Sequence, residues 1–165
     1  MKHYLEYLPH LKALIFDVDG VFTNAKLIIG PDGEYTRALN TKDMYALHRA
    51  KEAGLYVACI TRGTEPLLKT KLKELGVEDV FLGISFKIEP YEEILAMYGF
   101  KDEEVLYMGD DVPDIEVLNR VAVPCAPADA VHEVKAVAKY ISPLKGGDAC
   151  VRDVIEKVLR VQNKW

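Results

Sequence analysis

Short apolar runs alternate with amphipathic segments along most of this 165-residue chain. The apolar runs have the length of buried strands, and the segments between them have the spacing of helices. The expected strands are 13–18, 55–60, 80–82, 105–108 and 122–123, and the expected helices are 43–53, 65–75, 90–98, 113–120 and 151–161. This alternation predicts an α/β fold with a parallel sheet and helices on both of its faces.

Residues 21–39 depart from the alternation. Two strand-like stretches, 26–29 and 34–39, flank a Gly-Pro-Asp-Gly turn, which predicts a β-hairpin inserted after the first strand. A lone hairpin is marginally stable in water, so we expect it to pack on something, such as the same hairpin of a neighbouring subunit. The alternative is a decorated surface loop.

Length and composition indicate one globular domain, 1–165, because half of the residues are hydrophobic and the chain can form one full core. The net charge of −5 argues against nonspecific binding to nucleic acid. The three cysteines lack a C-x-x-C spacing, which disfavours a disulfide framework or a structural zinc site. No apolar run is long enough to span a membrane and no signal-peptide core is present, so we expect a cytoplasmic protein.

Two carboxylates, Asp17 and Asp19, follow the first apolar run directly. Side chains alternate along a strand, so both carboxylates are expected on the same side, while Gly20 lets the backbone turn away. Taken alone, this sequence is also compatible with a solvated turn. The residues after the other strands decide between the two interpretations.

In open α/β sheets the ligand site lies outside the carboxyl ends of the strands. Four expected strands of this chain are followed by polar or charged residues that can converge there: Asp17 and Asp19; Thr61, Arg62, Gly63 and Thr64; Lys87; Asp110, Asp111 and Asp114. We therefore predict one functional site at this edge of the sheet.

Asp17, Asp19 and Asp110 form an oxygen-rich set that suits a hard cation. Mg²⁺ is the expected ion, because it takes oxygen ligands and is commonly held by carboxylates together with a substrate phosphate. Crowded carboxylates without a cation would repel one another.

With a cation bound, one carboxylate remains as a nucleophile and another as a proton donor, as phosphoryl transfer through an aspartyl-phosphate requires. Asp17 is expected to attack and Asp19 to protonate the leaving oxygen. Thr61 and Lys87 can stabilise the phosphoryl oxygens. The alternatives are a strand-end or helix-capping role for Thr61 and a solvated surface position for Lys87. Asp114 is expected to orient water or Lys87, with a helix-capping role as the alternative.

Four motifs, in this order along the chain, resemble those of the haloacid dehalogenase superfamily of phosphohydrolases: Asp17-Val18-Asp19-Gly20-Val21, Ile60-Thr61, Lys87 and Gly109-Asp110-Asp111-x-x-Asp114. The resemblance implies a Rossmann-like core, with Asp17 as nucleophile and Mg²⁺ ligand and Asp19 as general acid that binds Mg²⁺ through its carbonyl. It implies Asp110 as the other protein ligand, with Asp111 and Asp114 behind it. Thr61 and Lys87 would bind phosphate.

Only the hairpin and one helix lie between the first two motifs, so the chain resembles the branch of that superfamily without a cap domain. Within this branch, the hairpin, residues 40–43 and residues 146–153 are similar to the 3-deoxy-D-manno-octulosonate 8-phosphate (KDO 8-phosphate) phosphatases. This resemblance implies a small sugar-acid phosphate as substrate. It also implies a homotetramer in which the hairpins pack together and neighbouring subunits partly cover each active site.

The resemblance implies a set of substrate-binding residues: Asp19, Asn40, Lys42, Asp43, His48, Arg62, Lys71 and Arg152. Arg152 is expected to bind substrate or to close a neighbour's site, and the alternative is a solvated arginine on the last helix. The chain departs from the family pattern at Arg62-Gly63, where Thr-Gly-Arg is usual, and at His48 and Lys71, where arginines are usual. Imidazole and ammonium groups cannot reproduce the two parallel hydrogen bonds that a guanidinium gives a carboxylate. A nonulosonate 9-phosphate or another sugar phosphate is therefore an alternative substrate.

Two functions of other classes are also considered. A phospho-receiver module uses clustered aspartates and a lysine, but it carries its phosphorylated Asp after a middle strand, where this chain has Thr61. A non-catalytic assembly subunit is disfavoured because the carboxylate cluster is complete.

Overall fold

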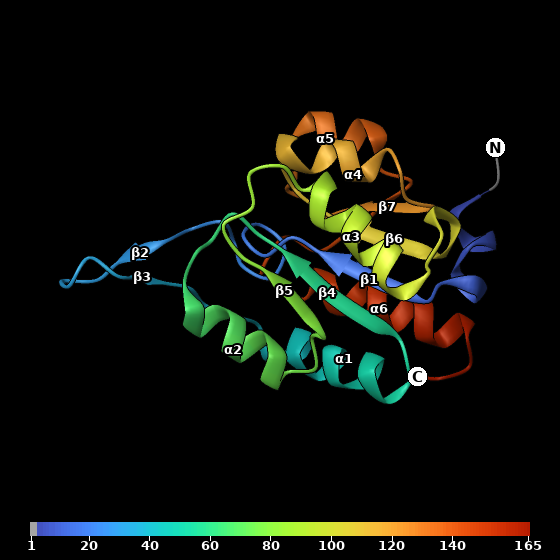
Figure 1. Cartoon of the computed structure of the whole chain (residues 1–165), viewed down its shortest axis with the longest axis horizontal. Coiled ribbons are helices and arrows are strands. Elements are labelled where there is room, and N and C mark those ends of the chain that lie inside the picture. The colour runs from blue at the N-terminus through green and yellow to red at the C-terminus, as the bar shows by residue number, and fades with distance from the viewer. Residues whose placement is uncertain (1–2) are drawn as a thin grey trace.

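The computed structural model describes residues 3–165 and contains a six-stranded parallel sheet between two layers of helices (Figure 1). The strand order is β5-β4-β1-β6-β7-β8. The strands are β1 Ala13–Phe16, β4 Tyr56–Ile60, β5 Asp79–Phe81, β6 Val105–Met108, β7 Val123–Ala126 and β8 Tyr140–Ile141. Because β1 pairs with β4 on one side and β6 on the other, its carboxyl end lies in the middle of the sheet.

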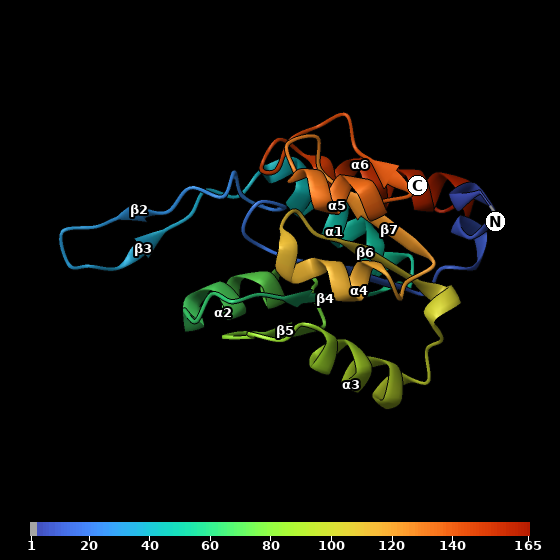
Figure 2. The ribbon, with the colours of Figure 1, turned by 90° about the horizontal axis from the view of Figure 1, so that it is seen from above.

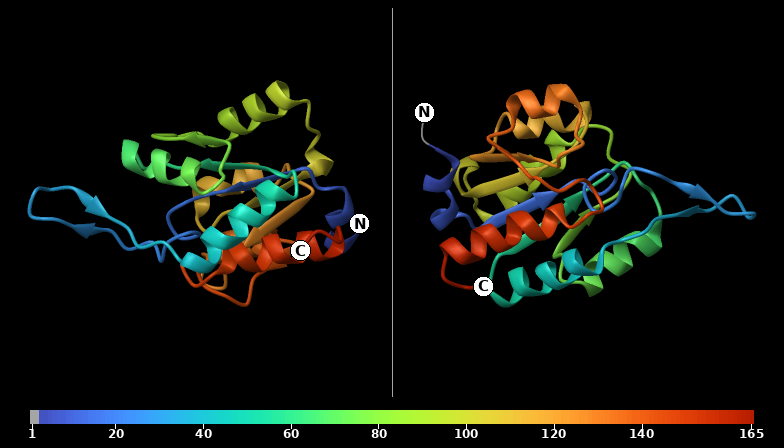
Figure 3. Two further views of the ribbon diagram at one scale, coloured as in Figure 1. Left: turned by 90° about the horizontal axis from the view of Figure 1, so that it is seen from below. Right: turned by 180° about the vertical axis from the view of Figure 1, so that it is seen from behind.

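Both faces of the sheet are buried, as parallel sheets require. Along β1, Leu14 and Phe16 pack into one core and Ala13 and Ile15 into the other. One face is covered by α1 Thr41–Glu52, α2 Pro66–Glu74 and α6 Cys150–Val161, and the other by α3 Ile88–Tyr98, α4 Ile115–Leu118 and α5 His132–Val137. Helices α1 and α6 lie side by side (Figure 3). The predicted Rossmann-like α/β fold is confirmed.

A β-hairpin follows β1, as predicted, and extends away from the body of the molecule (Figure 2). Its strands are β2 Ile28–Ile29 and β3 Tyr35–Thr36, which pair antiparallel. The paired region is shorter than predicted, and all of its residues are exposed. Residues 3–165 contain no cap domain between the hairpin and the sheet.

The structure differs from the predicted elements in the last third of the chain. The segment predicted as helix 113–120 begins as a 3₁₀ turn, Val112–Asp114, because Asp111 and Asp114 bond to the backbone of that turn. Strand β7 is longer than predicted, since it pairs with both β6 and β8. Helix α5 and strand β8 were not predicted, because they are too short to show a period. Among the described residues, no helix has the length and apolarity to cross a membrane.

Candidate active site

Asp17 lies at the carboxyl end of β1, where its carboxylate is held from two sides. One oxygen accepts a hydrogen bond from the backbone N–H of Val18 at 2.6 Å, and the other lies 2.9 Å from the ammonium of Lys87. Burial and the nearby Asp114 raise the pKa of Asp17 to about 7, although Lys87 opposes that rise. The carboxylate is thus poorly hydrated and close to a fixed positive charge, which suits a nucleophile.

Asp114 is fully buried and holds the groups around Asp17 in place. One of its oxygens accepts hydrogen bonds from Lys87 at 2.7 Å and from the Tyr107 hydroxyl at 2.6 Å. The other accepts the backbone N–H groups of Asp110 and Asp111. Lys87 is only 3% exposed, so this contact fixes the ammonium between two carboxylates.

Asp17, Asp110 and Asp114 offer carboxylate oxygens that all lie within 4.8 Å of one another. One oxygen of Asp110 is buried without a hydrogen-bond partner, and burial together with Asp17 and Asp114 raises the pKa of Asp110 to about 8. A divalent cation between Asp17 and Asp110 would bind the unpartnered oxygen of Asp110 and would favour the ionised form of both carboxylates. Since both oxygens of Asp114 already accept hydrogen bonds, Asp114 fits a supporting position better than a ligand position.

Gly20 permits the close approach of two strand ends. A Cβ atom at this position would overlap the carboxylate of Asp110, and the backbone φ of +91° disfavours any other residue. The glycine of the first motif therefore makes room for a metal-ligand candidate that comes from β6.

Asp19 does not point into the carboxylate cluster. Its two oxygens accept hydrogen bonds from Nε and Nη2 of Arg37, at 2.8 and 3.0 Å, and the hydroxyl of Thr23 lies 3.3 Å from one of them. Arg37 follows β3 at the base of the hairpin, and sequence reasoning did not single it out. No motif or spacing marks it, because the contact depends on where the base of the hairpin lies relative to the carboxyl end of β1.

A pocket of about 200 Å³ opens over these groups. Residues predicted after each of the four strands line it, although Gly63 and Thr64 do not. The lining residues are Asp17, Asp19, Ala25, Thr61, Arg62, Lys87, Asp110, Asp111, Pro113 and Asp114. The hydroxyl of Thr61 is buried and accepts the backbone N–H of Gly63 at 3.0 Å. The side chain of Arg62 is exposed at the pocket wall, and it has no ion-pair partner among residues 3–165.

Two of the predicted substrate-binding residues, Asn40 and Asp43, contact the backbone at the starts of α1 and α6. Asn40 caps α1 by accepting the N–H of Lys42, and its amide donates to the carbonyl of Gly147 at 2.9 Å. Asp43 is 1% exposed and accepts the backbone N–H of Arg152 at 2.7 Å, which caps α6. Burial raises the pKa of Asp43 to about 6. Neither residue lines the Asp17 pocket.

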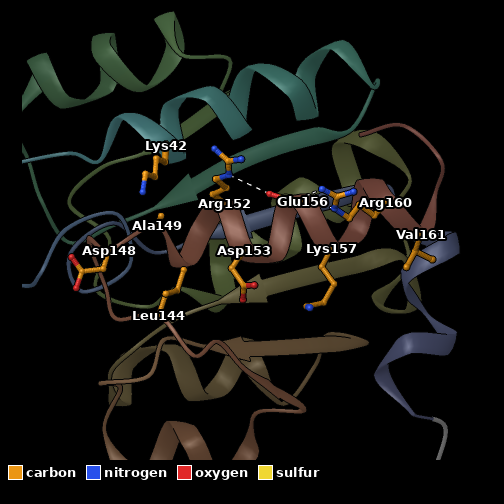
Figure 4. Close-up of a pocket in the computed structure, with 10 residues that line it drawn as sticks. All are labelled: Lys42, Leu144, Asp148, Ala149, Arg152, Asp153, Glu156, Lys157, Arg160 and Val161. Atoms are coloured by element: carbon orange, nitrogen blue, oxygen red, sulfur yellow. Dashed lines mark hydrogen bonds and ion pairs between the residues drawn. The ribbon is translucent and has the colours of Figure 1, made fainter.

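Asp19 and Arg62 line the Asp17 pocket, whereas four further predicted substrate-binding residues do not: Lys42, His48, Lys71 and Arg152. Lys42 and Arg152 line a separate groove of about 600 Å³ along α6, where Arg152 pairs with Glu156 (Figure 4). The exposed side chains of His48 and Lys71 each pair with a glutamate on their own helix. Within one subunit, the structure does not bring these four residues to the phosphate site.

The model of the haloacid dehalogenase-like hydrolase family matches residues 84–152. The 3-deoxy-D-manno-octulosonate 8-phosphate phosphatase of Yersinia pestis is 34% identical over 160 residues, which are 97% of this chain and 86% of that protein. A crystal structure of the Yersinia pestis enzyme superposes with a TM-score of 0.95 at 32% identity, covering 99% of this chain and 88% of that one.

The crystal structure of the Moraxella catarrhalis enzyme, in complex with a magnesium ion, a phosphate ion and a KDO molecule, superposes with a TM-score of 0.94 at 27% identity. It covers 99% of this chain and 94% of that one. Since sequence and fold agree over nearly the whole length, the chain belongs to the 3-deoxy-D-manno-octulosonate 8-phosphate phosphatase family of the haloacid dehalogenase-like hydrolases.

Proposed function

We propose that this protein is a Mg²⁺-dependent phosphatase of a small sugar-acid phosphate, with KDO 8-phosphate as the leading substrate. The observation that carries the proposal is the buried contact between Asp17 and Lys87, 2.9 Å apart beside the unpartnered oxygen of Asp110. This arrangement supplies a nucleophile, a fixed cation for the phosphoryl group and a place for a metal ion. The named substrate of the relatives supports the choice of sugar acid.

In the proposed reaction, a carboxylate oxygen of Asp17 attacks phosphorus, and the bond between phosphorus and the sugar oxygen breaks. Asp19 gives its proton to the departing sugar oxygen. Water then attacks the phosphorus of the aspartyl-phosphate, Asp19 takes a proton from that water, and inorganic phosphate leaves Asp17. Lys87 and Thr61 stabilise the phosphoryl oxygens throughout. Mg²⁺, held by Asp17, Asp110 and the carbonyl of Asp19, would neutralise phosphate charge.

A substrate panel tests this proposal. The purified protein should release phosphate from KDO 8-phosphate with Mg²⁺ and lose this activity when EDTA removes the metal, because the crowded carboxylates then repel the phosphate. Phosphate release is measured across KDO 8-phosphate, a nonulosonate 9-phosphate and neutral sugar phosphates. Activity restored by Mg²⁺ after EDTA treatment controls for unfolding. If the nonulosonate 9-phosphate is the preferred substrate, the proposed substrate is wrong and the proposed reaction stands. If no compound releases phosphate, both the substrate and the reaction are contradicted.

We also propose that the subunits assemble as a homotetramer through the hairpins. Four large apolar side chains of the hairpin are exposed, and such patches commonly mark interfaces: Leu27, Ile28, Ile29 and Tyr35. Light scattering on the purified protein should give the mass of four chains, and Ile29→Asp should give smaller species because it places a charge in the apolar contact. The exposed Lys73→Asp on α2 is the control for added negative charge. A wild-type protein of monomer mass would contradict the assembly.

We propose further that residues 1–165 act as one phosphohydrolase domain in the cytoplasm. All three cysteines are buried and free in the described chain, which suits a reducing compartment.

A further inference from the structure

Arg37 is nearly buried although it belongs to an exposed hairpin. Its side chain is 8% exposed, and all of its ion-pair partners are carboxylates. Nε and Nη2 grip the two oxygens of Asp19, and Nη1 lies 3.1 Å from Glu65 at the start of α2. These contacts raise the pKa of the Arg37 guanidinium. The residue therefore presents a permanent, planar fork of the shape that a carboxylate fills.

Gly63 leaves the space that this guanidinium needs. A Cβ atom at position 63 would lie 3.0 Å from Nη2 of Arg37 and 3.1 Å from an oxygen of Glu65. The loop after β4 thus brings Arg37 close to Thr61 and Arg62, which line the phosphate pocket. Asp19 also lines that pocket, whereas Arg37 does not, so the side chain of Asp19 stands between Arg37 and the substrate space.

The charge balance around Arg37 allows a second carboxylate only by exchange. One guanidinium already faces two carboxylates, Asp19 and Glu65, so the addition of a third negative group without departure of the first would leave two uncompensated charges. A carboxylate that takes the place of Asp19 would satisfy the same two donors and keep the charge count unchanged. Of the two partners, Asp19 is the one in contact with the pocket and is 30% exposed.

We propose that Arg37 is a specificity-determining residue that exchanges Asp19 for the carboxylate of the sugar-acid substrate. The exchange rests on the proposed function and explains how one substrate group prepares the site. When Arg37 holds the substrate carboxylate, the Asp19 side chain is free to turn toward the sugar oxygen that must leave. A neutral sugar phosphate offers no carboxylate, so Asp19 stays held by Arg37 and the leaving oxygen lacks its proton donor.

Arg37→Met tests the exchange, since it keeps the apolar stem and removes the fork. We expect kcat/KM for KDO 8-phosphate to fall about 10- to 100-fold, the loss typical of a charge-assisted bidentate contact. The kcat/KM for glucose 6-phosphate, a neutral sugar, should stay within about threefold or rise, because Asp19 is no longer held. The kcat/KM of Arg37→Lys for KDO 8-phosphate should lie between those of the wild type and Arg37→Met, since an ammonium keeps the charge but lacks the planar pair of donors.

Arg120→Met is the matched control, because Arg120 also binds two carboxylates, Glu92 and Asp102, but does not line the pocket. Arg120→Met should leave kcat/KM for both substrates unchanged. The melting temperatures of all variants show whether they are folded. An equal loss on both substrates in Arg37→Met would mean a structural role only and would overturn the exchange. If Arg37→Met has the wild-type kcat/KM for both substrates, the proposed exchange is also contradicted.

Binding of KDO without its phosphate separates this inference from the proposed reaction. Calorimetry should show about tenfold or weaker binding by Arg37→Met than by the wild type, in a measurement that needs no turnover. Equal binding by the two proteins, or none by the wild type, contradicts the exchange. If KDO binding depends on Arg37 but no phosphate ester is hydrolysed, the proposed phosphatase reaction is wrong, and the proposal that Arg37 binds the KDO carboxylate is supported.

Discussion

Asp17→Asn is expected to abolish phosphate release, lowering kcat by about 10⁴-fold or more, because removal of a covalent nucleophile leaves only substrate binding and the remaining electrostatic groups. The amide has nearly the size of the carboxylate, and its oxygen can still accept the N–H of Val18. The measurement is phosphate release from KDO 8-phosphate with saturating Mg²⁺. Incubation of the wild type with substrate, followed by an acid quench, should trap a phosphorylated chain that the variant lacks.

The fold of Asp17→Asn should be intact, which makes the loss interpretable. Burial raises the pKa of Asp17 to about 7, so the ionised form is disfavoured in the folded protein without metal. A neutral amide avoids this cost, and the melting temperature in EDTA at pH 8 should be unchanged or higher. Asp111→Asn, which changes an exposed carboxylate of the same pocket, is the comparison for charge alone. Activity of Asp17→Asn within tenfold of the wild type would refute the covalent mechanism.

The converging strand ends could be predicted because they depend on local pattern and on one topological rule. Each apolar run predicts a strand, and the carboxyl ends of parallel strands lie at the same edge of the sheet. Asp17, Lys87 and Asp110 therefore meet in space although they are distant in sequence. The same reasoning could not supply the partners of each group, because hydrogen bonds such as those from Tyr107 and Lys87 to Asp114 depend on side-chain packing.

Arg37 shows where sequence reasoning ended. Its position in the hairpin is predictable, but its contact with Asp19 requires the angle at which the hairpin leaves β1 and the space left by Gly63. Arginines on a hairpin are normally solvated, and no spacing distinguishes this one. Asn40 and Asp43 were predicted to contact substrate from their place in a family-like segment, and the sequence pattern did not indicate that their side chains accept N–H groups at the starts of α1 and α6.

The end of β4 bears on the phospho-receiver alternative. A receiver would need its phosphate-accepting Asp on a strand next to the acidic pair, and the residue after β4 is Thr61. The hydroxyl of Thr61 is buried and accepts the N–H of Gly63. The carboxylate best placed to accept a phosphoryl group is Asp17. It contacts Lys87, which also contacts Asp114, and it lies beside the candidate Mg²⁺ site.

Lys87→Met is expected to lower kcat at least about 100-fold, the effect of removing one preorganised charge from a site where negative charge is transferred. Lys87 lies 2.9 Å from Asp17 and 2.7 Å from Asp114, and it lowers the pKa of Asp17 against the effect of burial. The variant leaves two buried carboxylates without their shared cation. Loss of one partner of a buried pair typically costs about 3–5 kcal/mol, so the free energy of unfolding should fall as well.

The two effects of Lys87→Met can be separated with the variant Asp114→Asn. If Asp114 acts by orienting Lys87, Asp114→Asn lowers kcat in the wild-type background and has little further effect in the Lys87→Met background, as groups that act as a unit do. Lys139→Met is the control for stability, because Lys139 is half-buried, donates to the carbonyl of Ala122 and lies outside the pocket. Its kcat should equal that of the wild type. Additive losses from Lys87→Met and Asp114→Asn would show that Asp114 works independently, and the arrangement of Lys87 between two carboxylates would then not be what prepares Asp17 for attack.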